Sequence, residues 1–231
     1  MDAKLLTLVT NGLWESLYMT VLGTLFSYLI GLPCGLILAI TSPEGIRPNK
    51  AVNNTLGSIT NFLRSVPFII LMVAIIPFTR LVTGTSIGSR ATVVPLVVAA
   101  APLVARSVEA SVKGVDPGVV EAAQSMGATT WQIIRSVLLP EALPSLVIGL
   151  ASSTITILGF SAMAGVAGGG GLGAIAINYG YYRGQVDVMF IMVILLVLMV
   201  MLIQKAGERT SLSLDKTIRG ISGNDKTEDI N

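Results

Sequence analysis

Residues 16–40 read SLYMTVLGTLFSYLIGLPCGLILAI, a stretch of 25 residues without a charged side chain. The hydrocarbon core of a bilayer is roughly 30 Å thick and is crossed by about 20 helical residues. The segment therefore predicts a membrane-spanning helix. The composition agrees, since 52% of the 231 residues are hydrophobic and only 12% are charged. We expect an all-α, polytopic integral membrane protein.

The next two apolar segments are shorter than a full span. The charge-free part of the second is 65–79, and its helix has room to begin earlier, within 51–63, with Arg64 reaching an interface. The third segment, 91–105, is expected to continue as a helix to about Val112. Both segments contain prolines, which membrane helices tolerate where neighbouring groups satisfy the backbone.

The longest charge-free stretch, 142–182, exceeds one simple span. Its first part, 144–165, predicts the fourth helix. Its second part, 166–183, is rich in glycine and tyrosine and predicts a hairpin or re-entrant segment, and 188–204 is the fifth span. The expected regions are an external segment 1–15, a transmembrane region 16–209 and a polar tail 210–231.

Lysine and arginine residues divide unevenly between the two sides of these five spans. With the C-terminus in the cytoplasm, 11 of the 15 fall on the cytoplasmic side. Cytoplasmic loops of membrane proteins carry such an excess. We therefore expect the N-terminus outside, the C-terminus inside, and the long polar loop 113–143 in the cytoplasm.

The composition also excludes several kinds of site. The chain has no histidine and a single cysteine, Cys34, so one chain alone forms neither a disulfide nor a His/Cys metal or nucleophile site. Its net charge is only +2 and its basic residues are scattered along the chain, so no basic stripe suggests binding of nucleic acid. No Asp, Glu or His lies deep in a predicted span, and there is no GxxxxGKS or GxxxxGKT loop. These absences argue against a proton-coupled carrier and against ATP hydrolysis by this chain.

The polar loop carries helix signals of its own. Asp116 followed by Pro117 is typical of an N-cap and a first helical residue. Gly127 fits a left-handed position at the end of that helix. Thr129 and Gln132 predict a capping box at the start of a second helix. The loop is thus expected to form two short helices joined at Gly127.

The second helix has an apolar face at helical spacing. That face is expected to comprise Trp131, Ile134, Val137 and Leu138. Pro140 and Pro144 are expected to close the segment and return the chain to the membrane. The pair of helices is compatible with an amphipathic connector on lipid headgroups. Docking into a groove of another protein is favoured, because Ala122 and Ala123 offer little apolar area to a membrane.

This loop resembles the signature of permease subunits of bacterial ABC importers. The pattern stands here as Glu121-Ala122-Ala123, then Gly127, then Leu139-Pro140. In that family the loop forms coupling helices that sit in a cleft of a separate ATPase subunit. The resemblance implies that Glu121 is a polar anchor and Gly127 the turn between the helices. The coupling residues it implies are Glu121, Ala122, Ala123, Gly127, Thr129 and Gln132.

Further segments look like the methionine importer permeases within that family. They are 64–80, 84–89, 160–173 and the following NYGYYR stretch, which together with the loop cover most of 60–204. The resemblance implies a non-catalytic bacterial inner-membrane permease that carries D- or L-methionine by alternating access and has no cofactor of its own. The implied partners are a second copy of the chain, two ATP-binding cassette subunits that bind ATP and Mg, an external substrate-binding protein or lipoprotein, and membrane lipid.

Small or polar residues recur along the fourth span at spacings of three and four, which places them on one helical face. They are Ser145, Gly149, Ser152, Thr156, Gly159 and Met163. Two functions are open for this face. Membrane helices pack through small residues, and the resembled family builds its translocation path from two copies of the subunit, so the face is also a candidate to line that path.

Three other features have both structural and functional interpretations. Arg106 and Glu109 are three residues apart on one helix and are expected to pair, with Arg106 interpreted as an arginine that reaches the membrane interface. The glycine run 168–171 is interpreted as a place of close backbone approach, with an external gate or a docking surface as the other option. The tyrosines of 179–182 fit an interfacial aromatic belt anchored by Arg183.

Alternatives to the methionine permease differ in what they predict. A permease for another amino acid or small polar solute predicts a different ligand that stimulates uptake and ATPase activity. A secondary transporter or channel predicts uptake driven by an ion gradient alone. A structural membrane assembly factor predicts no transport.

Overall fold

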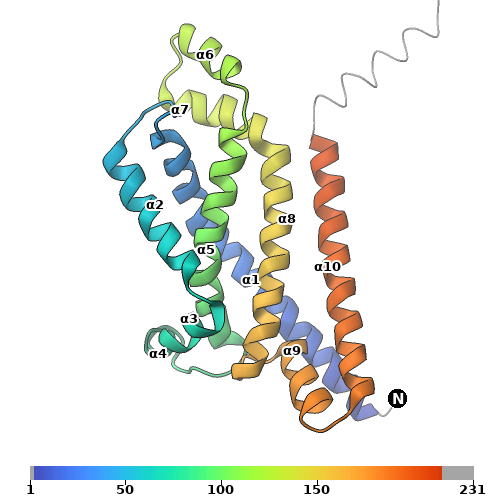
Figure 1. Cartoon of the computed structure of the whole chain (residues 1–231). Helices are drawn as coiled ribbons and strands as arrows, with labels where there is room; N and C mark the ends of the chain where they lie inside the picture. Colours follow the sequence, from blue (N-terminus) through green and yellow to red (C-terminus); the bar gives the residue numbers. More distant parts are fainter. Residues whose placement is uncertain (1–2, 215–231) are drawn as a thin grey trace, which may run out of the picture.

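The computed structural model describes residues 3–214, with side chains from residue 5 onward. This part of the chain folds into helices and their connecting loops (Figure 1). The α-helices are α1 Ala3–Thr41, α2 Lys50–Ser65, α3 Phe68–Ala74, α4 Ile76–Thr83, α5 Ser89–Lys113, α6 Pro117–Ser125, α7 Thr130–Ile133, α8 Leu139–Ala164, α9 Gly171–Ile175 and α10 Val186–Leu214. Two π-helical turns, Ile134–Leu138 and Ala176–Tyr181, and one 3₁₀ turn, Gly165–Ala167, connect them. The expected all-α membrane fold is confirmed.

Four helical segments of the described chain are long and apolar enough to cross a membrane: α1, α5, 130–181 (which contains α8) and α10. A fifth crossing results if α2 and α3, which meet at 100°, form one broken span. Figure 1 shows that α1 ends and α5 begins at opposite ends of the bundle. The segment from α2 to α4 therefore returns the chain across the bundle, as a second span is required to do.

The second span, expected around the charge-free part 65–79 with room to begin earlier within 51–63, is broken and is not one continuous helix. α2 ends at Ser65, and the next residue, Val66, is extended with φ −84° and ψ 123°. The residue before a proline avoids the helical conformation, and Pro67 has no N–H to continue the hydrogen-bond ladder. The charge-free stretch is consequently divided between α3 and α4. The region considered for an earlier start is instead a separate amphipathic helix, α2.

The other spans agree with the sequence at their centres and differ at their ends. α5 continues through Val112 as expected. α1 begins at Ala3 rather than near residue 16, and α10 continues to Leu214. The first residues of the expected tail, 210–214, are thus helical, and 215–231 lie outside the described residues.

The expectation that Pro140 and Pro144 close the coupling segment is also wrong. The helix that starts at Thr130 passes through a π turn directly into α8, and Pro144 lies inside α8. Pro140 cannot donate to the carbonyl four residues before it, and the wider turn at 134–138 lies where that bond would be missing. The second short helix therefore passes into the fourth span without an intervening loop, and Figure 1 shows that the chain bends between them.

α1 and α5 pack closely because two glycines on α1 face the backbone of α5. A Cβ atom on Gly31 would lie 2.7 Å from the carbonyl oxygen of Ala101, and one on Gly35 would lie 2.7 Å from Cβ of Val108. Small residues four apart permit such an approach between membrane helices. This pair forms the centre of the bundle, and α2 and α8 lie on either side of α5 (Figure 1).

Candidate coupling surface and translocation face

The coupling helices α6 and α7 lie at the end of the bundle where α5 ends and α8 begins (Figure 1). The sequence signals that define them are confirmed. Asp116 caps α6 by accepting a hydrogen bond of 2.8 Å from the N–H of Gly118, and Pro117 is the first helical residue. After α6, Gly127 has φ +79°, the left-handed region that favours glycine. The chain therefore reverses at Gly127.

The capping box at the start of α7 is confirmed as well. The N–H and the hydroxyl of Thr129 each donate to Oε1 of Gln132 at 2.8 Å. The N–H of Gln132 donates back to Oγ1 of Thr129 at 3.4 Å. These bonds satisfy backbone donors that the first turn of a helix leaves unpaired. Thr129 and Gln132 thus fix the direction in which α7 leaves the turn.

The three residues of the Glu-Ala-Ala motif do not share one environment. Glu121 and Ala122 are exposed, whereas Ala123 is 5% exposed and packs with Ile133 and Leu138. Ala123 therefore packs α6 against α7 and the π turn that follows it. The outward surface of α6 includes Glu121 and Ala122, and it continues into Met126, which directly follows the helix and is 81% exposed.

Trp131 is not part of the buried face that the sequence analysis gave to the second helix. Its side chain is 67% exposed, and Ile133 is buried in its place. The face that packs inward comprises Ile133, Ile134, Val137 and Leu138. The exposed Met126 and Trp131 flank the turn at Gly127 and give the coupling surface an apolar part beside Glu121.

A groove of about 290 Å³ lies between α6 and the loop that follows α1. The groove is lined by Glu121 and Gln124 of α6, by Ser42 and Glu44 of the loop, and by Lys113 at the end of α5. Sequence reasoning did not find it, because the two walls are far apart along the chain. The groove joins the motif glutamate to a second carboxylate, Glu44, that carried no sequence signal.

Arg106 and Glu109 pair as expected, with 2.6 Å between Nη1 and Oε2. Arg106, expected to reach the membrane interface, also has partners on a second helix. Its Nη2 donates to Oδ1 of Asn61 at 2.8 Å and to the carbonyl oxygen of Gly57 at 3.2 Å, both on α2. The guanidinium therefore joins two helices within the chain.

The small and polar face of α8 is mostly exposed. Ser145, Ser152, Thr156, Gly159 and Met163 are exposed, and Gly149 is half-buried. A Cβ on Gly149 would clash with Oγ of Ser107 on α5, whereas one on Gly159 would meet no atom within 4 Å. Ser145 donates to Ser111 at 2.9 Å. Packing within the chain therefore accounts only for the end of this face that contains Ser145 and Gly149. The rest of the face is exposed and is free to contact lipid, a second chain or cargo.

The glycine run 168–171 is a place of close backbone approach, as expected. Gly168, Gly170 and Gly171 have φ of +86°, +82° and +77°. Oε2 of Glu15 accepts a hydrogen bond from the N–H of Gly171, and Oγ of Ser16 accepts one from the N–H of Leu172. The run thus seats the hairpin 165–181 on α1. Behind it, Arg183 stacks on Tyr179, with Cζ 4.3 Å from the ring centroid.

These features together define a class of protein. A bundle of long apolar helices that displays two short, capped helices at one end is a multi-pass membrane protein. The chain belongs to the family of binding-protein-dependent transport system inner membrane components, whose profile matches residues 31–210.

Similar proteins fall in one part of that family. The probable D-methionine transport system permease protein of Vibrio cholerae is 47% identical over 201 residues, which cover 87% of this chain and 89% of the relative. The D-methionine transport system permease protein of Escherichia coli K12 is 48% identical over 165 residues, 71% of this chain and 76% of the relative.

Solved structures agree with this assignment. An inward-facing conformation of the MetNI methionine ABC transporter matches with a TM-score of 0.91 and 46% identity, covering 93% of this chain and 100% of the other. The crystal structure of an amino acid ABC transporter with histidines matches with a TM-score of 0.74 and 25% identity, covering 90% and 95%.

Proposed function

We propose that this chain is the permease subunit of an ATP-driven methionine importer. Two copies form the translocation path, two ATP-binding cassette subunits bind ATP and Mg, and an external substrate-binding protein delivers the amino acid. The end of the bundle that carries α6 and α7 faces the cytoplasm, and the excess of lysine and arginine at that end supports this orientation. The N-terminus lies outside and the tail inside.

The observation that carries the proposal is the coupling surface. Glu121, Ala122 and Met126 present an exposed acidic and apolar surface that nothing in residues 3–214 covers. The uninterrupted helical backbone from Thr130 through the π turn into α8 connects this surface to the small and polar face. A push on α7 is therefore transmitted to α8 without an intervening loop.

Alternating access follows from this connection. When the ATPase subunits close on ATP, the coupling helices are drawn together and each α8 rotates with them. The path then opens outward to accept methionine, and hydrolysis reverses the movement. The likeness to an inward-facing methionine transporter supports an inward-open arrangement for the present structure.

The path itself is proposed to form between the two copies, along the exposed face of α8. Ser152, Thr156 and Met163 offer hydroxyl groups and a thioether to a small amphipathic amino acid. The same face includes Gly159, which leaves room for a second chain. Methionine is favoured as cargo because relatives above 40% identity over most of the chain are described as D-methionine permeases.

A reconstitution experiment tests the proposal. The chain is produced with its candidate ATPase subunit and binding protein, purified as a complex and placed in proteoliposomes. We expect a permease and ATPase ratio of two to two, and uptake of D- or L-methionine that requires internal ATP. Uptake of another amino acid in preference to methionine would revise the cargo. Uptake driven by an ion gradient in the absence of the ATPase would overturn the function.

A further inference from the structure

Three charged residues in the last two turns of α5 form one connected group, which we call the α5 triad: Arg106, Glu109 and Lys113. Oε2 of Glu109 lies 2.6 Å from Nη1 of Arg106, and Oε1 lies 2.8 Å from Nζ of Lys113. Glu109 is only 7% exposed, so its two oxygens are committed to these two cations. Separating a buried charge from its partners is costly, which makes the triad a stiff connection.

One end of the triad holds α2. Of the 16 residues of α2, only Gly57 and Thr60 are buried, so little apolar packing fixes this helix. Arg106 donates to the carbonyl oxygen of Gly57 and to the side chain of Asn61. A Cβ on Gly57 would lie 3.4 Å from Nη2 of Arg106, which is van der Waals contact with the guanidinium. This arginine therefore links α2 to α5, while Asn53 of α2 separately donates to the carbonyl oxygen of Leu38 on α1 at 2.8 Å.

The other end of the triad reaches the coupling surface. Lys113 lines the groove that also contains Glu121 and Gln124 of α6. One carboxylate, Glu109, thus connects a lysine beside the coupling helix to an arginine bound to α2. α2 and α3 meet at an angle of 100°, so α2 does not continue the direction of α3. Its position is therefore set by contacts with other helices.

We propose that the α5 triad couples α2 to the coupling helices, so that α2 follows the movement that the ATPase imposes on α6. Arg106 is a positioning residue in this scheme: it does not touch cargo or ATP, and it acts by holding α2. The inference rests on the proposed coupling function of α6. Energetic coupling between distant sites requires a physical element that both sites bias, and the triad with α2 is that element.

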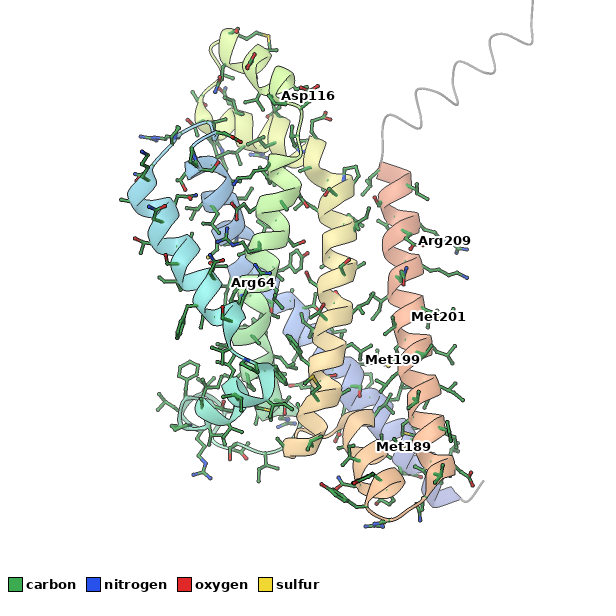
Figure 2. The ribbon with its side chains drawn as sticks, viewed as in Figure 1. Arg64, Asp116, Met189, Met199, Met201 and Arg209 are labelled. Atoms are coloured by element: carbon green, nitrogen blue, oxygen red, sulfur yellow. The ribbon has the colours of Figure 1, made fainter. Side chains whose placement is uncertain are left out.

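Arg106→Gln tests the proposal in the complete transporter in proteoliposomes. The variant keeps the pair between Glu109 and Lys113 and removes the cationic donor to α2. We expect ATP hydrolysis to continue while methionine imported per ATP falls by roughly 5- to 150-fold, the usual range of coupling between two sites. Arg64→Gln is the matched control, because Arg64 is an exposed arginine on α2 outside the triad, and it should import at the wild-type ratio (Figure 2).

Two further variants separate coupling from local stability. Asn61→Ala removes a single acceptor and is expected to lower the methionine imported per ATP less than Arg106→Gln does. If Arg106→Gln does not assemble, an unchanged ratio in Asn61→Ala would overturn the proposal. The charge exchange Arg106→Glu with Glu109→Arg keeps an ion pair within α5 but cannot donate to the carbonyl of Gly57. Restored import in the exchanged protein would show that the pair within α5 suffices and would overturn the proposal.

A distance measurement gives a readout that does not depend on activity. Spin labels are placed at Ser58 on α2 and Val119 on α6, both exposed, in a Cys34→Ser background. We expect one narrow distance distribution in the wild type, with and without ATP, and a broad one in Arg106→Gln. A narrow distribution in the variant would contradict the proposal. If the wild-type complex itself neither assembles nor imports methionine, the proposed function fails, which is a different result.

Discussion

The carboxylate of Glu15 accepts a hydrogen bond of 2.6 Å from the backbone N–H of Gly171, 156 residues further along the chain. The bond holds the start of α9 on α1. A Cβ on Gly170 would lie 2.6 Å from the same oxygen, so a side chain at this position would displace the carboxylate of Glu15. The hairpin 165–181 is therefore positioned by the residue that directly precedes the charge-free run of the first span.

Glu15→Ala should loosen this hairpin. A hydrogen bond to a charged group contributes roughly 1.5–3 kcal/mol, so we expect a loss of stability of that order. Glu15→Gln retains a neutral acceptor and should lose less. The measurement is thermal unfolding of the purified protein together with the rate of proteolysis within 165–171. Equal stability of the alanine variant and the wild type would show that the bond is not needed to seat the hairpin.

Glu121→Lys should leave the chain inserted in the membrane and abolish its coupling to the ATPase. Glu121 is exposed on α6, so reversing its charge disturbs no buried contact in the chain, and any loss comes from the partner surface. Copurification of the ATPase and ATP-dependent uptake are the measurements. Glu208→Lys, an equal charge reversal on an exposed residue of α10, is the control. Wild-type transport by the Glu121 variant would contradict the coupling role.

Gly127→Val should impair assembly by straining the turn between α6 and α7. Gly127 has φ +79°, and a left-handed conformation costs a residue with a Cβ about 1–2 kcal/mol, with β-branched side chains worst. No atom lies within 4 Å of a Cβ at this position, so the effect is conformational and not a clash. Gly127→Asn tolerates this conformation and should assemble normally. Equal assembly of the valine and asparagine variants would argue against the hinge.

Gly159→Leu should block transport without unfolding the chain. A side chain at Gly159 points into space that the chain itself leaves open, whereas a leucine at Gly149 would clash with Ser107 of α5. We therefore expect the Gly159 variant to express and insert normally but to lose dimerisation or uptake. The Gly149 variant should be poorly expressed. Wild-type uptake by Gly159→Leu would indicate that this part of the face contacts lipid and not a second copy or the path.

Local signals were sufficient for the helix caps and for the turn of the coupling loop. Asp116, Pro117, Gly127, Thr129 and Gln132 are capping and turn residues, and their hydrogen bonds reach only a few positions along the chain. Such bonds are specified by neighbouring residues, so short sequence patterns predict them. The break in the second span was missed although Pro67 carried its signal, because charge-free length was weighed above the effect of a proline on the residue before it.

The sequence by itself determined that the chain crosses a membrane, where the first, third, fourth and fifth spans lie, and that two capped helices stand apart from them. These properties follow from hydrophobic length and local hydrogen bonding, which depend on neighbours in the chain. Only the tertiary structure decided that Glu15 binds Gly171, that Arg106 holds α2, and that Ala123 is buried while Glu121 is exposed. Each of these depends on which helices meet and at what rotation, and packing of distant segments decides that.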